Sequence, residues 1–138
     1  MSTRRVSLML ALLAATSLGG AGALAAQNSM AAAWQATPAS VLKSALRSVA
    51  AAQERYRAAH GIYAASADGL DVRPEYGVRV EILLAGDSGW QAKATHQTQP
   101  GRSCVVFVGS LDKVEAPRTD EDREMAGEEG IPLCDRMQ

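Results

Sequence analysis

The most regular pattern in the sequence is a three-four spacing of apolar and small residues between Thr37 and Gly61. Such spacing places one stripe of side chains along a single face of an α-helix. Thr37 is a good N-cap, Pro38 suits the first helical position, and Gly61 suits the left-handed conformation that ends helices. The pattern therefore predicts one helix over residues 38–60. Its predicted buried stripe is Leu42, Ala45, Leu46, Val49, Ala52, Tyr56 and Ala59.

Beyond Pro74 the apolar period changes to two, which is typical of strands with one buried face. Alternating or apolar runs at 78–84, 90–97 and 103–108 are separated by short turns rich in Gly, Asp, Ser and Pro. Short turns between strands predict antiparallel pairing. We therefore predict an α+β domain in which one long N-terminal helix packs on one face of a three- to four-stranded antiparallel sheet. The first strand is expected to point these side chains toward the core: Val78, Val80, Ile82 and Leu84.

The last part of the chain, residues 111–138, is strongly acidic, with nine Asp or Glu and four Lys or Arg. This composition predicts an exposed loop, because so polar a segment does not bury itself. A calcium site is the other interpretation, but the segment lacks the spacing and central Gly of an EF-hand. We take residues 111–133 of this loop, together with the adjoining sheet edge, as a candidate interaction surface. Its acidic residues of interest are Asp120, Glu121, Asp122, Glu124, Glu128 and Glu129.

The chain has two cysteines, Cys104 and Cys134. In an oxidising compartment they are the only pair available for a disulfide within the chain. Closing a loop of that length would stabilise the fold by about 3.5 kcal/mol in the chain-entropy model. Reactive thiols, or half of a metal site, are the alternative interpretations.

The first residues have the features of an export signal. Arg4 and Arg5 precede an uncharged run rich in Leu and Ala, residues 6–26. The small residues that end at Ala25 fit the signal-peptidase rule and predict cleavage before Ala26. The alternative is an uncleaved anchor in the inner membrane, since the run is just long enough to span a bilayer.

This interpretation divides the chain into a signal peptide at 1–25, a flexible lead-in at 26–36 and one α+β domain at 37–138. The predicted location is periplasmic or secreted. The formal net charge of −1 gives no reason to expect a nucleic-acid partner.

One short motif suggests catalysis. Gly86, Asp87, Ser88 and Gly89 reproduce the tetrapeptide around the nucleophile of chymotrypsin-like serine proteases. That chemistry needs a positioned His base and a two-barrel frame, for which this chain is too short. We interpret the motif as a hairpin turn. We also predict no cofactor and no metal site, because two histidines, at 60 and 96, make no recognisable ligand pattern.

The run at residues 45–64 resembles the second half of the long helix of type IV pilins and type II secretion pseudopilins. In that family a Gln-Glu-x-Tyr segment, here Gln53 to Tyr56, leads to a small residue, a Gly and a Tyr. The resemblance covers about residues 40–138. Further matches follow in order at Gly77-Val78, at Gly89-Trp90-Gln91-Ala92, at Cys104, and at Gly130-Ile131-Pro132-Leu133-Cys134-Asp135.

The resemblance implies a pilin-type head with a C-terminal loop closed by a disulfide, in which Cys104 and Cys134 take the positions of the loop-closing pair. In this family the loop is a surface for subunit contacts or adhesion. The chain departs from the family in having no acid before Glu54, and in the Thr37-Pro38 interruption before the helix.

We therefore predict an exported, non-enzymatic pilin-like domain that acts through contact with protein partners of the cell envelope. Pilus or secretion components are candidates for these partners. One alternative is a membrane-anchored minor pilin or pseudopilin subunit that keeps residues 6–26. Another is a binder of small apolar ligands between helix and sheet.

Overall fold

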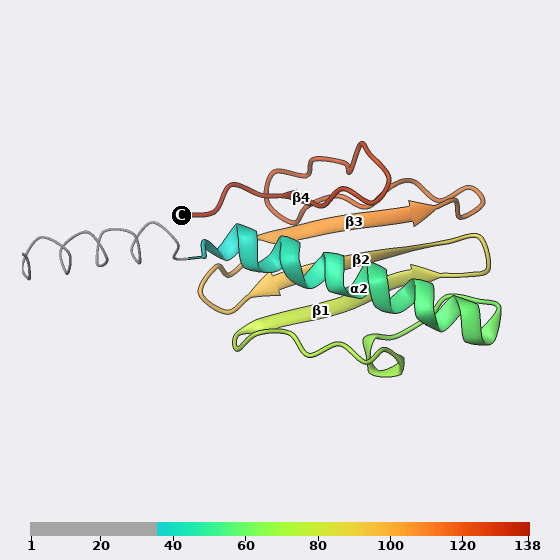
Figure 1. Cartoon of the computed structure of the whole chain (residues 1–138). Helices are drawn as coiled ribbons and strands as arrows, with labels where there is room; N and C mark the ends of the chain where they lie inside the picture. The colour runs from blue at the N-terminus through green and yellow to red at the C-terminus, as the bar shows by residue number, and fades with distance from the viewer. Residues whose placement is uncertain (1–35) are drawn as a thin grey trace, which may run out of the picture. The chain divides into compact units, whose positions relative to one another are not determined.

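The structure, a computed structural model, describes residues 36–138 (Figure 1). The predicted signal peptide at 1–25, the alternative anchor at 6–26, and the lead-in up to residue 35 lie outside the described residues. The described part forms one α-helix, one short 3-10 helix and four strands. Their bounds are Pro38–His60 for α2, Ala67–Gly69 for η1, Val78–Ala85 for β1, Gly89–His96 for β2, Ser103–Gly109 for β3 and Leu133–Cys134 for β4.

The ends of α2 lie where the sequence predicts them. The Thr37 hydroxyl accepts a hydrogen bond from the Ser40 N–H (3.2 Å), and Pro38 is the first helical residue. Gly61 ends the helix at φ +79°, and its N–H donates to the Arg57 carbonyl (2.8 Å). The helix opens the described domain, but it is not at the N-terminus of the chain, because it begins at residue 38.

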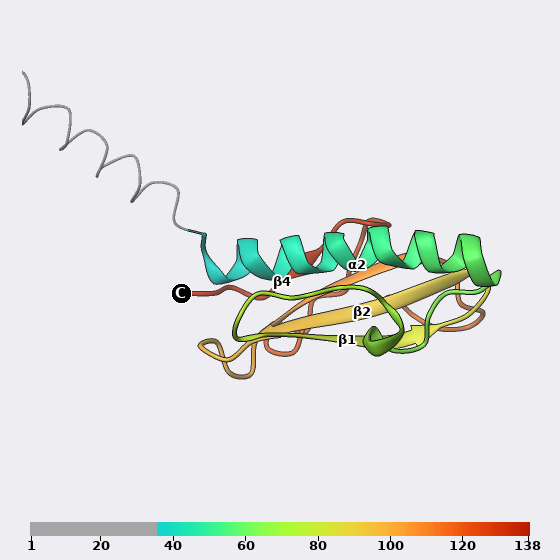
Figure 2. The ribbon, with the colours of Figure 1, turned by 60° about the horizontal axis from the view of Figure 1, so that its bottom comes forward.

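The helix lies across one face of the sheet, which we call the inner face (Figure 2). Leu42, Leu46 and Val49 of α2 are fully buried there, as predicted, and Trp90 is the largest fully buried side chain of the sheet. Burial of this apolar area is the main driving force for packing the helix on the sheet. The buried inner-face residues of the sheet are Ile82, Trp90, Ala92, Ala94, Cys104 and Val106.

Burial along α2 departs from the predicted stripe at its C-terminal end. Tyr56 is only half-buried, Ala59 is exposed, and Gln53 is fully buried instead. The Gln53 amide donates to the Ala64 carbonyl (2.9 Å) and accepts from the Ala64 N–H (2.7 Å). The chain returning from the helix at residues 63–64 therefore packs beside the last turns on the Gln53 side, which leaves Ala59 in solvent.

The four strands form one antiparallel sheet in the order β1-β2-β3-β4. Trp90 of β2 lies opposite Val108 of β3, and Cys104 of β3 lies opposite Cys134 of β4. The predicted α+β architecture, one helix on a three- to four-stranded antiparallel sheet, is therefore confirmed at this level.

The prediction that Leu84 points toward the core is wrong. A β-bulge between Ile82 and Leu84 shifts the register of β1 against β2. Leu84 therefore lies opposite Gln91 and is 46% exposed, while Ala85 takes the position opposite Trp90. One extra residue in a strand reverses the alternation beyond it, because side chains alternate with a period of two.

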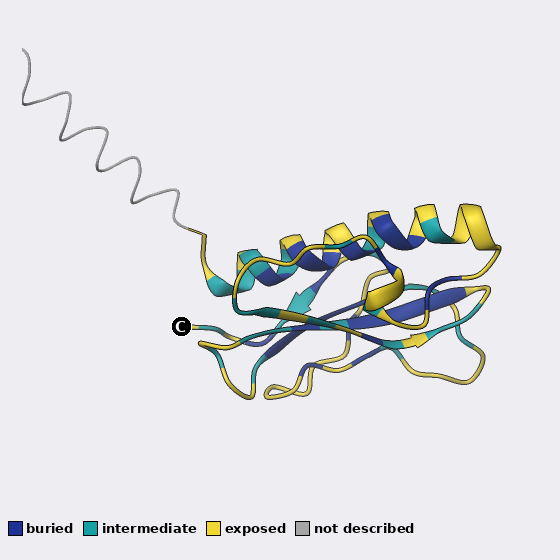
Figure 3. Ribbon diagram, turned by 90° about the horizontal axis from the view of Figure 1, so that it is seen from below, coloured by how far each residue is buried: buried dark blue, intermediate teal, exposed yellow. Residues whose placement is uncertain are grey.

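The expectation that the sheet hides only one face is also wrong. The opposite face, which we call the outer face, is partly covered by the C-terminal segment at residues 111–132, the acidic loop (Figure 3). Pro117, Thr119 and Ala126 of this loop are buried, although most of its other residues are exposed. The outer-face residues buried beneath it are Gln91, Ser103 and Val105.

Candidate interaction surface

A disulfide closes the acidic loop. Cys104 in β3 and Cys134 in β4 are bonded and lie directly opposite each other, with their Cα atoms 3.9 Å apart. The predicted pairing is confirmed, and the reactive-thiol and metal-ligand interpretations are wrong because both sulfur atoms are in the bond. The disulfide fixes the end of the acidic loop to the third strand.

The next residue, Asp135, holds the same loop from inside. Its side chain is 3% exposed, and one carboxylate oxygen accepts hydrogen bonds from the N–H groups of Ser103 (2.8 Å) and Glu121 (3.1 Å). The other oxygen accepts from the N–H of Asp122 (2.8 Å). A single carboxylate therefore joins the start of β3 to the middle of the acidic loop.

Two opposing effects act on the pKa of Asp135. Burial of the carboxyl favours its neutral form and by itself would raise the pKa. The hydrogen bonds from Asp122, Ser103, Thr119 and Glu121 favour the charged form and together outweigh burial, so the pKa is lowered. Asp135 is thus an ionised anchor at neutral pH, with its charge compensated by N–H and O–H donors.

The loop folds back on itself above this anchor. Thr119 N–H donates to the Glu124 carbonyl (2.9 Å), and Ala126 N–H donates to the Pro117 carbonyl (3.0 Å). The turn between them contains Arg123 in the left-handed region, at φ +56°. These bonds give the polar segment a defined backbone shape, which its composition alone does not predict.

Two of the predicted acidic residues pair with bases, one in β2 and one in the turn between β2 and β3. Asp120 lies 3.4 Å from the ammonium group of Lys93 in β2, and Glu121 lies 2.7 Å from the guanidinium group of Arg102. Both carboxylates are largely solvated, so each pair contributes little to stability. Their effect is to orient the loop on the sheet.

Two more of the predicted residues accept hydrogen bonds from the backbone. Asp122 accepts from the N–H of Arg136 (3.2 Å), and Glu129 accepts from the N–H of Gly109 (2.6 Å) at the end of β3. These carboxylates satisfy main-chain donors where the loop meets the sheet. They are therefore structural as well as exposed.

The last two predicted residues, Glu124 and Glu128, are different. Both are exposed, and within residues 36–138 neither carboxylate has a hydrogen bond or an ion pair. Their charges are available to a partner. The structure thus places all six predicted acidic residues on one ordered loop and separates them into four engaged carboxylates and two unengaged ones.

The tetrapeptide that suggests a protease forms the turn between β1 and β2. Gly86 N–H donates to the Gly89 carbonyl (2.9 Å), and the Ser88 hydroxyl donates to the carboxylate of its neighbour Asp87 (3.0 Å). The hairpin interpretation is confirmed. Across the described part of the chain, no three His, Cys, Asp or Glu side chains gather closely enough to hold a metal ion.

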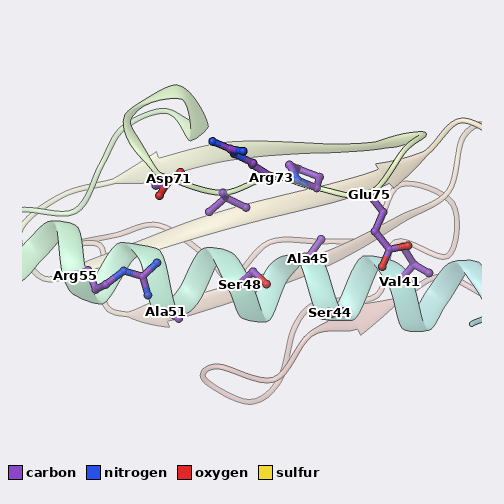
Figure 4. A pocket seen from close by; sticks show the side chains of 11 residues that line it. Val41, Ser44, Ala45, Ser48, Ala51, Arg55, Asp71, Arg73 and Glu75 are labelled. Carbon is purple, nitrogen blue, oxygen red and sulfur yellow. The ribbon is translucent and has the colours of Figure 1, made fainter.

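A groove of about 380 Å³ lies between α2 and residues 71–75, and none of its lining residues belongs to the acidic loop (Figure 4). Ser44 and Ser48 lie on its helix side, and Arg55, Asp71 and Glu75 bring charges to it. It is a surface groove with a polar lining. The space between helix and sheet, where an apolar ligand was one interpretation, is instead filled by fully buried side chains such as those of Leu42, Leu46 and Trp90.

Sequence reasoning missed two residues that shape the domain: Asp135 holds the acidic loop, and Gln53 holds the chain that leaves the helix. Composition places Asp135 among the acids of an exposed tail, and its position directly after Cys134 is the signal that the sequence offers. The sequence singles out Gln53 only within the family-like segment. Its fully buried amide directs the chain leaving the helix, and a lone polar residue within an apolar stripe was the sign of it.

No protein-family model matches the sequence, and no curated protein matches it either. Within residues 36–138, α2 is the long helix, and it is not apolar enough to cross a membrane. The disulfide is the type of bond that forms and persists in oxidising compartments, and it points to an exported protein.

Proposed function

We propose that this chain is an exported pilin-like head that acts in the cell envelope, periplasmic or secreted, through contact with a protein partner. The contact surface is the acidic loop at residues 111–132. The observation that carries the proposal is the unengaged pair Glu124 and Glu128, displayed on a loop held by a disulfide and by Asp135. A loop ordered in advance loses less conformational entropy on binding than a mobile one.

The pilin-like part of the proposal rests on the order of the elements and on the resembling segment. A single long helix, an antiparallel sheet and a disulfide-closed C-terminal loop are the features that the resemblance implies. Within the segment, Gln53 binds the backbone of Ala64 and Glu54 accepts a hydrogen bond from the Tyr63 hydroxyl (3.2 Å). Burial, with the carboxylate of Glu54 beside it, raises the pKa of Tyr63, so this hydroxyl stays protonated and donates. The resembling residues thus shape the exit from the helix.

The partner class follows from charge. Exposed carboxylates without internal partners attract a surface rich in Lys and Arg, and such attraction weakens as salt rises. A non-enzymatic role agrees with Ser88, whose hydroxyl is bonded to its neighbour Asp87 within a hairpin turn. We therefore expect a protein with a basic patch, bound through the acidic loop.

The test is capture of envelope proteins on the full chain as the cell processes it, with and without the substitutions Glu124→Lys and Glu128→Lys. We expect at least one protein to be captured by the original chain in low salt, released at about 0.5 M salt, and lost with the substituted chain. Equal capture by both chains would reject the acidic loop as the contact surface.

The matched control is the pair Asp71→Lys and Glu75→Lys. These two exposed acids line the groove beside α2, and their reversal changes the net charge by the same amount. Capture that survives the control and fails with the loop variant assigns the contact to the loop. Capture that fails with both would show that only the overall charge matters.

A second candidate is a membrane-anchored minor pilin or pseudopilin subunit. The uncharged run at residues 6–26 is the observation in its favour. The intact mass of the protein isolated from cells distinguishes the two. A chain that begins at Ala26 or Gln27 supports the exported head, and a chain that retains residues 6–26 supports the anchored subunit.

A further inference from the structure

The strand β1 forms one edge of the sheet. Among the described residues, no strand pairs with the backbone of β1 on the side away from β2, which we call the open edge. Seen from below, β1 lies at the edge, with the segment that precedes it on the helix side (Figure 3). An edge of this kind is a template for pairing with another strand. β1 runs over Val78–Ala85, and the bulge after Ile82 limits its regular part to residues 78–82.

The hydrogen-bond pattern shows which backbone groups face outward. Gln97 N–H donates to the Gly77 carbonyl (2.9 Å), which makes these two a hydrogen-bonded pair at the start of β1. Because such pairs alternate along an antiparallel ladder, Arg79 and Glu81 bond to β2. The residues between them, Val78, Val80 and Ile82, therefore direct their N–H and C=O groups to the open side. Of these groups, the Val78 N–H is already used by the Glu75 carbonyl (3.1 Å).

We propose that two copies of this chain pair through β1, antiparallel and around a two-fold axis at Val80. In this register the N–H of each Val80 donates to the carbonyl of Val80 in the other copy. The N–H of each Ile82 donates to the carbonyl of Val78 in the other copy. The same arrangement places Arg79 of one copy opposite Glu81 of the other, twice, by symmetry.

Charge selects this register over its neighbours. Shifting the strands by two residues in either direction keeps outward-facing groups opposite each other. One such shift places Arg79 opposite Arg79 of the second copy, and the other places Glu81 opposite Glu81. Like charges directly opposite each other destabilise strand pairs, whereas opposite charges stabilise them. The edge is thus complementary to itself in a single register.

Both charged side chains are available for this pairing. Arg79 and Glu81 are exposed, and within residues 36–138 neither has an ion pair. Lys93, which lies opposite Glu81 in the sheet, is instead bound to Asp120 (3.4 Å). Lys93 is therefore engaged elsewhere, and the charges of Arg79 and Glu81 remain without an ion pair within residues 36–138.

A groove of about 270 Å³ beside the edge offers further contact area. It is lined by Val72, Pro74, Val78 and Val80 together with residues of η1 and α2. A second strand at the edge would cover this apolar lining. The interface remains small, so we expect a weak dimer whose population depends on concentration.

The experiment is sedimentation velocity over a range of concentrations, on the full chain as the cell processes it. We expect a reversible monomer–dimer equilibrium. Arg79→Glu alone, or Glu81→Arg alone, should weaken it by about tenfold or more, because each puts like charges opposite each other twice. An equimolar mixture of the two variants should restore it, since the mixed pair is again complementary.

Circular dichroism of each variant tests its folding, and the mixture serves as an internal control, because a misfolded chain would not be rescued. Hydrogen exchange locates the contact: the amides of Val80 and Ile82 should exchange more slowly as concentration rises. A chain that is monomeric at all concentrations up to about 1 mM overturns the proposal. A dissociation constant above about 1 mM corresponds to a binding free energy weaker than about 4 kcal/mol, which is too weak for a specific dimer. A dimer indifferent to both substitutions, or one without protection at Val80, overturns it as well. None of these results bears on the acidic loop.

Discussion

The two faces of the sheet are covered by different means. The inner face is covered by α2 through apolar side chains, with Leu46 and Trp90 fully buried between them. The outer face is covered in part by a loop of nearly opposite composition, held by a disulfide, a buried carboxylate and directional hydrogen bonds. A sheet can therefore be covered by a strongly acidic segment, provided that specific bonds supplement the small apolar area that the segment buries.

The largest effect should come from removing the covalent fastening of the outer face. Cys104→Ala with Cys134→Ala should lower the free energy of unfolding by about 3.5 kcal/mol, because the unfolded chain regains the entropy of an open loop. Urea unfolding at pH 7 measures it. A loss below about 1 kcal/mol would mean that the loop is held almost entirely by its hydrogen bonds.

The inner face should respond nearly as strongly to one apolar truncation. Leu46→Ala leaves a cavity beneath α2, and we expect a loss of about 3 kcal/mol in the same unfolding assay. Leu84→Ala is the matched control, since this leucine is 46% exposed beside the bulge, and its loss should stay below about 1 kcal/mol. Equal losses for the two variants would contradict the assignment of the core to the inner face.

The carboxylate anchor should have a smaller effect that depends on pH. At pH 7, Asp135→Asn should cost about 2 kcal/mol, because three N–H groups lose a charged acceptor. The folded pKa lies below the ordinary value of 3.8, so the stabilisation is complete above that value and is lost as the pH falls through the folded pKa. The urea midpoints of the two chains should therefore begin to converge as the pH falls below 3.8, and should meet only below the folded pKa. A gap that stays constant with pH would contradict an ionised anchor.

The smallest effect is expected at the two unengaged acids. Glu124→Gln with Glu128→Gln should leave the urea midpoint unchanged within error, because neither carboxylate has a partner within residues 36–138. Asp120→Asn with Glu121→Gln provides the comparison, since these two carboxylates form ion pairs with Lys93 and Arg102. Destabilisation confined to the first pair would show that its charges serve the fold and not a partner.

The inner face could be predicted from the sequence because its apolar residues recur with the regular spacing of a helix or a strand. The helix from Pro38 to His60 and its stripe through Ala52 follow from spacing and capping alone, and so do the turns that make the strands antiparallel. The bulge after Ile82 breaks the period by one residue, and nothing in that run of apolar residues marks it. The exposure of Leu84 could therefore not be predicted.

The outer face could be predicted only in part. Composition identified the acidic loop and its exposed carboxylates, and counting cysteines identified the disulfide. The burial of Thr119 and Asp135 depends on contacts between residues far apart in the chain, such as the bond from Ser103 N–H to the Asp135 carboxylate. Contacts of this kind have no local signature. The burial of Thr119 and Asp135 could therefore not be predicted from the sequence.

Because Asp135 directly follows Cys134, the end of the acidic loop is held by two bonds that respond to different chemical conditions. The Cys104–Cys134 disulfide withstands acid but is broken by a reductant. The Asp135 carboxylate is unaffected by a reductant but loses its charge in acid. Neither a thiol at neutral pH nor an acidic oxidising medium removes both. Two consecutive residues thus keep the acidic surface in shape across a wider range of chemical environments than either bond would alone.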